Sequence, residues 1–291
     1  MKIMKIDFYS QNRSKFEHFI DEALEEDLGA GDHSGRACID SNTKKSAVLL
    51  VKEECRIAGV ALAASIFKRY DAKIEIEIYR HDGEIVPPSE RVFGVKGPAQ
   101  SLLATERLVL NCMQRMSGIA TMTHRLCQMI RHTDCILLDT RKTTPNFRYP
   151  EKWAVAIGGG TNHRIGLFDA LMIKDNHIDY CDSLGKALQK TRNYLDQIGK
   201  ELPVIVETRN VNEVEQALEF PWITRILLDN MSPKKLIESI KRIDGRIPTE
   251  ASGNINTSTI VDYAETGVDY ISMGAITHSA LPIDLSLKAI S

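Results

Sequence analysis

The sequence has no excess of charge of either sign and no long apolar run. Its 291 residues include 37 Lys+Arg and 39 Asp+Glu, which gives a formal net charge of −2. Proteins that bind nucleic acid or a membrane surface generally carry a basic excess, so we expect neither partner, although a small basic pocket is compatible with this balance. The longest apolar run, 60–67, is interrupted by Ser65 and is far too short to span a bilayer.

Paired cysteines are also missing. The six cysteines form no C-x-x-C pair, and a chain of this length can fold without disulfides. The spacings typical of zinc ligands are absent as well. The first 19 residues become polar within a few positions, so we expect no secretory signal peptide. These features predict reduced thiols, no structural zinc and a cytoplasmic location.

The composition is that of a globular protein, with 43% hydrophobic and 26% charged residues, and the length suits one large or two ordinary domains. We place the boundary near Gly118, which is expected to break a long helix. The two expected domains are 1–116 and 117–291, and the last residues are candidates to pack back on the first domain. In the first domain the apolar spacing predicts helices over 16–26, 60–70 and 99–130 and strands over 47–52 and 73–79.

From Cys135 onward, short apolar strands alternate with helical segments, a pattern typical of parallel strands covered by helices. Six strands are too few for a complete eight-stranded barrel, which leaves a shortened or irregular one. Ser232 followed by Pro233 predicts a helix start with a serine cap. The expected strands are 135–140, 170–175, 202–208, 225–230, 247–252 and 270–275, and the expected helices are 184–198, 211–220, 233–243 and 257–266.

Nearly every one of these strands ends in a polar or charged group. In a parallel α/β barrel the carboxyl ends of the strands open onto one face, where the loops build the active site. We therefore expect these groups to converge on one mouth; the alternative is that each is only the solvated start of a loop. The strand ends are Asp139-Thr140-Arg141-Lys142, Lys174-Asp175-Asn176-His177, Glu207, Asp229-Asn230, Glu250-Ala251-Ser252-Gly253 and Ser272-Met273-Gly274.

Several of these groups are cations. Two like charges about 4 Å apart interact by roughly 4 kcal/mol at an effective dielectric constant of about 20, so a cluster of them predicts an anionic substrate with several carboxylates or phosphates. Arginine in particular suits bidentate pairing with a carboxylate. The alternative is that the cations pair with nearby acids and are structural. The cations are Arg141, Lys142, His163, Arg164 and Lys174, and the acids are Glu151, Asp169 and Asp175.

Glu207 and Asp229 follow neighbouring strands of the chain. Two carboxylates facing phosphates commonly hold Mg²⁺, which completes its shell with water and phosphate oxygens. The same acids could instead grip ribose hydroxyls or neutralise the lysines.

Two glycine-containing segments are candidates for binding an anion through their backbone. Ser252-Gly253-Asn254, ahead of the helix expected near Thr257, and Gly274 suit backbone contacts to a phosphate, although a Ser-Gly pair alone is a weak signal. Gly158-Gly159-Gly160 lacks the flanking residues of a Walker or Rossmann loop. We interpret it as a flexible connector that lets His163 and Arg164 reach the pocket.

At these residues the chain resembles the quinolinate phosphoribosyltransferase family (nicotinate-nucleotide pyrophosphorylase, carboxylating). The resemblance runs from about Ala23 to Leu287 and is most specific in DTRKTTP, GGGTNHRIGL and IKDNHI, with further agreement in EALEEDLGAGDHS, ATERLVLNCMQRMSGIAT, LLDN and EASGNI. It implies an α/β fold, with an N-terminal α/β sandwich domain followed by an incomplete parallel α/β barrel.

The resemblance also implies a reaction. Quinolinate and phosphoribosyl pyrophosphate would give nicotinate mononucleotide, CO₂ and pyrophosphate, a pentosyltransferase step of NAD biosynthesis. It further implies Mg²⁺ and a homodimer in which Arg107 is lent to the neighbouring subunit. The quinolinate-binding groups would be Arg107, Thr140, Arg141, His163, Arg164 and Lys174, and the phosphoribosyl pyrophosphate groups would be Lys142, Glu207, Asp229, Ser252, Gly253, Asn254, Met273, Gly274 and Ala275.

Some positions depart from the family pattern, and some alternatives stay open. The family often has acids two places before and two places after Glu207, where this chain has Ile205 and Arg209. A phosphoribosyltransferase that takes another carboxylated base is one alternative. A barrel lyase with a Schiff base on Lys142 or Lys174 is a second. A non-catalytic anion-binding protein is a third.

Overall fold

The computed structural model describes residues 8–290, and the chain divides into two compact units. The first comprises the described residues of Met1–His124, Thr143–Gly159 and Ile276–Ser291, and the second comprises Arg125–Lys142 and Gly160–Ala275. The chain therefore enters the second unit, returns to the first for one helix, and ends in the first.

The first unit is built on a four-stranded antiparallel sheet with strand order β12-β1-β5-β3. The last strand of the chain lies beside the first, with Leu287 opposite Leu49. A short two-stranded sheet, β2 with β4, accompanies it. The strands are β1 (Lys44–Val51), β2 (Cys55–Arg56), β3 (Glu75–Ile78), β4 (Ile85–Val86), β5 (Arg91–Pro98) and β12 (Leu285–Ile290).

Helices pack against this sheet and against one another, as a sandwich requires. Phe67 of α4 meets Phe93 of β5 edge-on, with ring centroids 6.0 Å apart. Phe16 of α2, which is fully buried, meets Trp153 of α6 in the same way at 5.3 Å. The helices of this unit are α1 (Phe8–Gln11), α2 (Arg13–Leu28), α3 (His33–Cys38), α4 (Val60–Tyr70), α5 (Ala99–Met129, whose end enters the second unit), α6 (Arg148–Gly158) and α12 (Ala275–His278).

Gly118 does not break the long helix, so that prediction was wrong. Helix α5 continues through it to Met129. A Cβ at this position would lie 2.0 Å from the carbonyl oxygen of Leu281 and 3.3 Å from Cα of Pro282. The glycine therefore permits the returning C-terminal segment to cross closely over the helix, a role that sequence spacing does not reveal.

The second unit is a six-stranded, wholly parallel sheet with strand order β6-β11-β10-β9-β8-β7. Strands β6 and β7 form its two edges and do not pair with each other, so the barrel is incomplete, as expected. The strands are β6 (Ile136–Leu138), β7 (Leu171–Ile173), β8 (Val204–Thr208), β9 (Arg225–Asp229), β10 (Thr249–Ser252) and β11 (Tyr270–Ser272).

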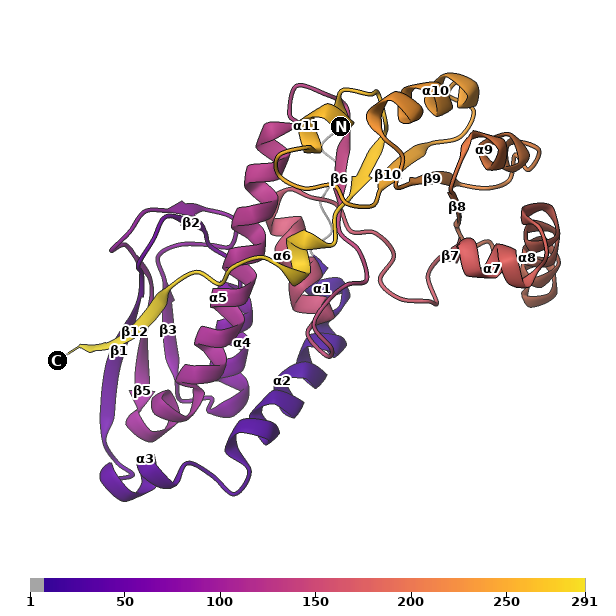
Figure 1. The fold of residues 1–291 in the computed structure, drawn as a ribbon. Helices are drawn as coiled ribbons and strands as arrows, with labels where there is room; N and C mark the ends of the chain where they lie inside the picture. Colours follow the sequence, from indigo (N-terminus) through magenta and orange to yellow (C-terminus); the bar gives the residue numbers. More distant parts are fainter. Residues whose placement is uncertain (1–7, 291) are drawn as a thin grey trace, which may run out of the picture. The chain divides into compact units, whose positions relative to one another are not determined.

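Helices α8, α9 and α10 lie along one side of these strands (Figure 1). Helix α8 begins where Ser183 accepts a hydrogen bond from the Lys186 backbone and ends at Gly199, whose φ is +62°. Helix α10 has Pro233 in its first turn as predicted, but the Ser232 side chain makes no capping bond. The helices are α7 (Asp175–Tyr180), α8 (Leu184–Ile198), α9 (Val211–Leu218), α10 (Pro233–Ile243) and α11 (Ile260–Ala264).

The glycine run 158–160, which the sequence suggested is a flexible connector, includes the end of a helix. Gly158 belongs to α6, and a Cβ there would lie 2.6 Å from Cβ of Thr123. Gly159 caps the helix with a φ of +98°. These two glycines therefore serve helix packing and helix termination. Among the described residues, no helix is long and apolar enough to cross a membrane.

Candidate active site

The carboxyl ends of six parallel strands bring most of the predicted site residues to one edge of one sheet. Glu207 lies in β8, Asp229 ends β9 and Ser252 ends β10. Arg141 and Lys174 lie just beyond the two edge strands, β6 and β7. Arg107 is different, because it lies in α5 of the first unit, where its side chain is exposed.

Glu207 and Asp229 form an acid pair on neighbouring strands. Burial raises the pKa of Glu207, and the negative charge of Asp229 raises it further, while the positive charge of Lys174 opposes the shift. Two carboxylates in one another's field favour a cation between them.

The donor set at this pair suits Mg²⁺ rather than a metal held by the protein alone. Among residues 8–290 there is no group of three or more His, Cys, Asp or Glu side chains that could hold a metal ion. Mg²⁺ is commonly bound through one or two carboxylates together with substrate phosphates. Glu207 and Asp229 fit that pattern, with the remaining ligands left to substrate and water.

Arg141 and Arg164 form a guanidinium pair. Burial lowers the pKa of Arg164, and the positive charge of Arg141 lowers it further, against the effect of Asp169. The Nε atom of Arg141 is buried and has no hydrogen-bond partner within the described part of the chain. A buried donor in that state costs about 1–3 kcal/mol. This arrangement favours an anionic ligand at the pair.

Two of the acids that might have neutralised these arginines have other hydrogen-bond partners. Glu151 lies in the first unit, fully buried, where it accepts from Nε of Arg115 at 3.0 Å. Both carboxylate oxygens of Asp169 accept backbone N–H groups, from Ile165 at 2.6 Å and from Gly166 at 2.8 Å. Pairing with Glu151 or Asp169 therefore does not account for the guanidinium pair.

Two buried carboxylates hold the segment that carries Arg164. Asp139 accepts from the Asn162 side chain at 2.6 Å and from the His163 backbone at 2.8 Å. Glu250 lies 3.2 Å from the His163 ring. In the sequence both acids stand out only as strand ends, with no predicted role. Their position beside predicted site residues was the available signal.

The loop after β10 is shaped for close backbone approach. Gly253 has a φ of +92°, and a Cβ there would lie 2.3 Å from Oδ1 of Asn230. Asn254 donates to the same oxygen at 2.9 Å. Helix α11 begins at Ile260, later than predicted, and has only five residues. The expected help from a helix dipole is therefore missing, and backbone groups of the loop itself are left for an anion.

Met273, Gly274 and Ala275 follow the neighbouring strand β11. The Met273 backbone donates to the Leu138 carbonyl at 3.0 Å, which fixes the start of this segment.

Neither departure from the family pattern intrudes on the acid pair. Ile205 is only 5% exposed. Arg209 is held by two acids, with Nε donating to Glu213 at 2.8 Å and Nη1 donating to Asp179 at 3.1 Å. The charge of Arg209 is therefore balanced locally.

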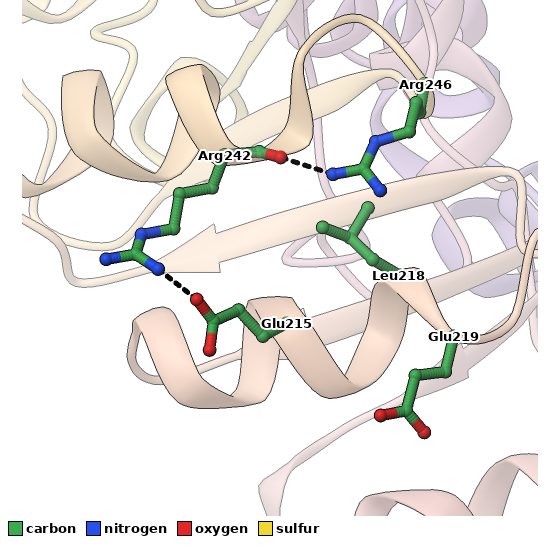
Figure 2. Close-up of a pocket in the computed structure, with 5 residues that line it drawn as sticks. All are labelled: Glu215, Leu218, Glu219, Arg242 and Arg246. Carbon is green, nitrogen blue, oxygen red and sulfur yellow. Dashed lines mark hydrogen bonds and ion pairs between the residues drawn. The ribbon is translucent and has the colours of Figure 1, made fainter.

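A pocket of about 390 Å³ lies elsewhere, between the carboxyl-terminal ends of α9 and α10 (Figure 2). Its charged groups are largely matched within the chain, since Arg242 pairs with Glu215 and Arg246 donates to the Arg242 carbonyl. Helix carboxyl termini face the amino ends of the strands in such a fold, so this pocket is not part of the charged sheet edge. The lining residues are Glu215, Leu218, Glu219, Arg242 and Arg246.

Comparison with known proteins identifies the family. The model described as the C-terminal domain of quinolinate phosphoribosyl transferase matches residues 119–288, and the model of its N-terminal domain matches 32–117. The chain belongs to the quinolinate phosphoribosyltransferase family. This confirms the resemblance found in the sequence and, with the sheets described above, the predicted fold class.

Individual members of the family are similar over most of their length. The mitochondrial quinolinate phosphoribosyltransferase [decarboxylating] 2 of Nicotiana glauca is 44% identical over 281 residues, covering 91% of this chain and 80% of that protein. A probable nicotinate-nucleotide pyrophosphorylase [carboxylating] of Bacillus subtilis is 35% identical, covering 95% and 94%. The solved structure of the nicotinate-nucleotide pyrophosphorylase from Francisella tularensis is 38% identical, with a TM-score of 0.88 over 95% and 96% of the two chains.

The raised pKa of Glu207 predicts a stability effect. A raised pKa means that folding favours the protonated form, so the ionised form destabilises the protein at pH values above that pKa. Glu207→Gln should therefore unfold at higher urea concentration than the parent at pH 7.5, and the gain should shrink below pH ~4.5, where the unfolded-state carboxyl is itself protonated. Glu219→Gln removes one charge from an exposed position and should change the midpoint little. A less stable Glu207→Gln variant at pH 7.5 would contradict the electrostatic description of the acid pair.

Proposed function

We propose that this chain is a quinolinate phosphoribosyltransferase (decarboxylating). It transfers the phosphoribosyl group of phosphoribosyl pyrophosphate to quinolinate, giving nicotinate mononucleotide, CO₂ and pyrophosphate, in NAD biosynthesis. The observation that carries this assignment is family membership over nearly the whole chain, together with an acid pair and a guanidinium pair at one sheet edge.

Quinolinate carries two carboxylates, and Arg141, Arg164 and Lys174 would meet them. The buried, unpartnered Nε of Arg141 and the field that it exerts on Arg164 support this assignment, since a dianion would relieve both. Thr140 would lie beside the same ligand. His163, which directly precedes Arg164, would lie beside the ligand as well.

Phosphoribosyl pyrophosphate would lie over the middle strands of the sheet. Glu207 and Asp229 would hold Mg²⁺ or the ribose hydroxyls, and Mg²⁺ when bound would neutralise pyrophosphate charge. The loop 252–254 and the segment 273–275 would offer backbone N–H groups to phosphate oxygens. Support comes from the left-handed backbone at Gly253 and from the location of both segments at the strand ends.

Charge development explains why these residues suit the reaction. As the bond between ribose C1 and pyrophosphate breaks, the sugar gains oxocarbenium character and the leaving group gains negative charge. Lys142 would stabilise the departing pyrophosphate, and the acids would stabilise the sugar cation. The cations orient the pyridine nitrogen for attack on C1, which needs no general base. The 2-carboxylate then leaves as CO₂, and its bonding electrons pass to the pyridinium ring.

Purified protein with Mg²⁺ and phosphoribosyl pyrophosphate, given quinolinate or nicotinate in separate reactions, tests the assignment. We expect mononucleotide and CO₂ in equal amounts from quinolinate and no turnover of nicotinate. Efficient turnover of nicotinate would instead favour a phosphoribosyltransferase for another base. Trapping of a covalent adduct by borohydride would favour a Schiff-base lyase. Absence of Mg²⁺-dependent pyrophosphate release would leave a non-catalytic anion-binding protein.

Lys142 and Arg164 should be separable by kinetics. Lys142→Ala should lower kcat about 100-fold, since it removes charge stabilisation at the leaving group, and should leave quinolinate affinity little changed. Arg164→Ala should weaken quinolinate binding about 30-fold or more, measured by calorimetry. Lys186→Ala, at an exposed position of α8, and Arg192→Ala, at a half-buried position of the same helix, are matched controls and should change neither quantity. Unchanged quinolinate affinity in Arg164→Ala would refute its role.

We also propose that the active enzyme is a homodimer in which Arg107 serves the site of the partner subunit. Arg107 is exposed and makes no hydrogen bond or ion pair within residues 8–290, and Leu103, one helical turn earlier, is 48% exposed. A cation beside an exposed leucine suits a helix surface that a second copy would cover.

Subunit mixing tests this proposal. Arg107→Ala and Lys142→Ala proteins, each expected to have little activity alone, are unfolded together, refolded and assayed. Mixed dimers would contain one intact site each, so about one quarter of wild-type activity should return. Glu207→Ala mixed with Lys142→Ala is the control and should recover nothing, because both residues lie in the same barrel. Lack of recovery with Arg107→Ala would place this arginine in its own subunit's site or in neither.

We propose that the protein is located in a reducing compartment such as the cytoplasm. All six cysteines are free thiols. Burial raises the pKa of Cys55, Cys112 and Cys135 to about 12 in each case, which keeps these thiols protonated and unreactive.

A further inference from the structure

Asp139 is a fully buried acid at the charged sheet edge, and the proposed reaction gives it no role. It directly follows β6, one of the two edge strands between which the barrel is open. A carboxylate is rarely buried unless hydrogen bonds or opposite charges compensate its lost hydration. The contacts of this carboxylate therefore indicate what it does for the site.

The chain that follows α6 runs briefly beside β6, in parallel. Leu138 and Thr161 form a parallel bridge. The Thr161 N–H donates to the Leu137 carbonyl at 2.9 Å, and the Thr161 carbonyl accepts from the Asp139 N–H at 3.2 Å. In a regular parallel ladder the next N–H, that of His163, would donate to the main-chain carbonyl of Asp139. In this structure it donates to Oδ1 of the Asp139 side chain at 2.8 Å. The carboxylate therefore continues the ladder at the point where the strand ends.

The second carboxylate oxygen of Asp139 holds the same segment. The Asn162 side chain donates through Nδ2 to Oδ2 at 2.6 Å. Hydrogen bonds to an ionised acceptor are shorter and roughly twice as strong as those between neutral groups. Two consecutive residues, one through its side chain and the next through its backbone, are thus bound to one carboxylate. A backbone held at these two points restricts the direction of the residue that follows, Arg164.

Asp139 and its partners also lie close in sequence to both members of the guanidinium pair. Arg141 comes two residues after Asp139, and Arg164 comes one residue after His163. The pKa of Arg164 is lowered first by burial and further by the charge of Arg141, so the two cations lie within each other's field. Such cations repel each other, and a backbone without ladder hydrogen bonds can yield to that repulsion. The carboxylate links the two segments and opposes their separation.

We propose that Asp139 is a positioning residue that holds the segment 161–164 on the end of β6 and so sets the spacing of Arg141 and Arg164 for the two carboxylates of quinolinate. The inference rests on the proposed binding of quinolinate at these arginines. It deepens that proposal, because the affinity for a rigid dianion depends on how well the two cations are preorganised. Asp139 acts through its neighbours and does not touch the substrate.

Asp139→Asn removes one acceptor and the negative charge while keeping the size of the side chain. Its amide oxygen can accept from only one side, so either the Asn162 side chain or the His163 N–H would face another donor. We expect quinolinate affinity, measured by calorimetry, to fall about tenfold or more. The affinity for phosphoribosyl pyrophosphate with Mg²⁺ should change less than about twofold, since its proposed contacts lie mainly on β8 to β11. Unchanged quinolinate affinity, or an equal loss for both ligands, would overturn the proposal.

A reciprocal exchange separates the lost hydrogen bond from general damage. Asn162→Asp alone would place a second carboxylate against Asp139 and should also weaken quinolinate binding about tenfold. In the double variant Asp139→Asn/Asn162→Asp the polarity of the pair is reversed. The amide at position 139 can then donate to the carboxylate at position 162 and still accept the His163 N–H. We expect this double variant to bind quinolinate within about threefold of the parent. A double variant at least as weak as either single variant would contradict the role of Asp139.

Asp82→Asn is the matched control. Asp82 also uses both carboxylate oxygens to accept backbone N–H groups, from Val60 at 2.9 Å and from Ala61 at 3.1 Å, but it lies in the first unit. This variant should unfold at lower urea concentration than the parent and keep its quinolinate affinity. A loss of affinity as large as that of Asp139→Asn would mean that lower stability alone weakens binding, and the positioning role would be lost.

The segment can also be followed without any ligand. Hydrogen exchange of the folded protein, read by mass spectrometry on peptides covering 161–166, should be about tenfold faster in Asp139→Asn than in the parent and slow again in the double variant. Exchange at the parent rate in Asp139→Asn would show that the carboxylate does not hold the segment. If the wild-type protein bound no quinolinate, the proposed function would fail, whereas hydrogen exchange would still decide whether Asp139 holds the segment.

Discussion

Like charges held at one edge of a parallel sheet are the constraint on which the rest of this structure depends. The fold places the carboxyl ends of six strands together, and the sequence fills that edge with two acids on β8 and β9 and with arginines next to β6. Within each pair, the charge of one group shifts the pKa of the other: Asp229 raises the pKa of Glu207, and Arg141 lowers the pKa of Arg164. Such arrangements reduce stability in the free protein and become favourable when ions of opposite charge bind, which is the usual compromise at a functional site.

The acid pair and the guanidinium pair are built by different means. Glu207 and Asp229 lie within regular strands, so ladder hydrogen bonds fix their backbones. Arg164 lies on an irregular segment, where backbone N–H groups must find other acceptors. Buried carboxylates and a histidine ring supply those acceptors. Lys174 shows a related contact, since its backbone N–H donates to Nδ1 of His177 at 3.0 Å. In both places an imidazole fixes the backbone of a cation.

Local patterns predicted the helices of this protein well and its close contacts poorly. Helices α4, α8 and α10 have the predicted bounds, because apolar periodicity and capping residues are short-range signals. The order of the six strands, the return of α6 to the first unit and the pairing of β12 with β1 depend on contacts between distant residues. Gly118 illustrates the limit, because its helix looks interrupted in sequence, whereas the reason for the glycine is a backbone more than 160 residues away.

The site shows the same division. Residue type and strand position were enough to select the acids and most of the cations, since the carboxyl ends of parallel strands must share an edge. They were not enough for the contacts of His163, because its ring accepts the Arg164 backbone N–H at Nδ1, and residue type does not reveal a contact between a side chain and the backbone. The incomplete barrel explains where such residues occur. Strands β6 and β7 do not pair, and the chain between Thr161 and Ala170 passes from one to the other without a ladder. Backbone that lacks a ladder must be held by side chains, so the break in the barrel is where buried Asp139 and Glu250 are needed. Arg164 lies on this same segment, so regular strand geometry does not fix the direction of its guanidinium. The incomplete barrel and the position of Arg164 therefore have the same cause, which is that no strand pairing joins β6 to β7.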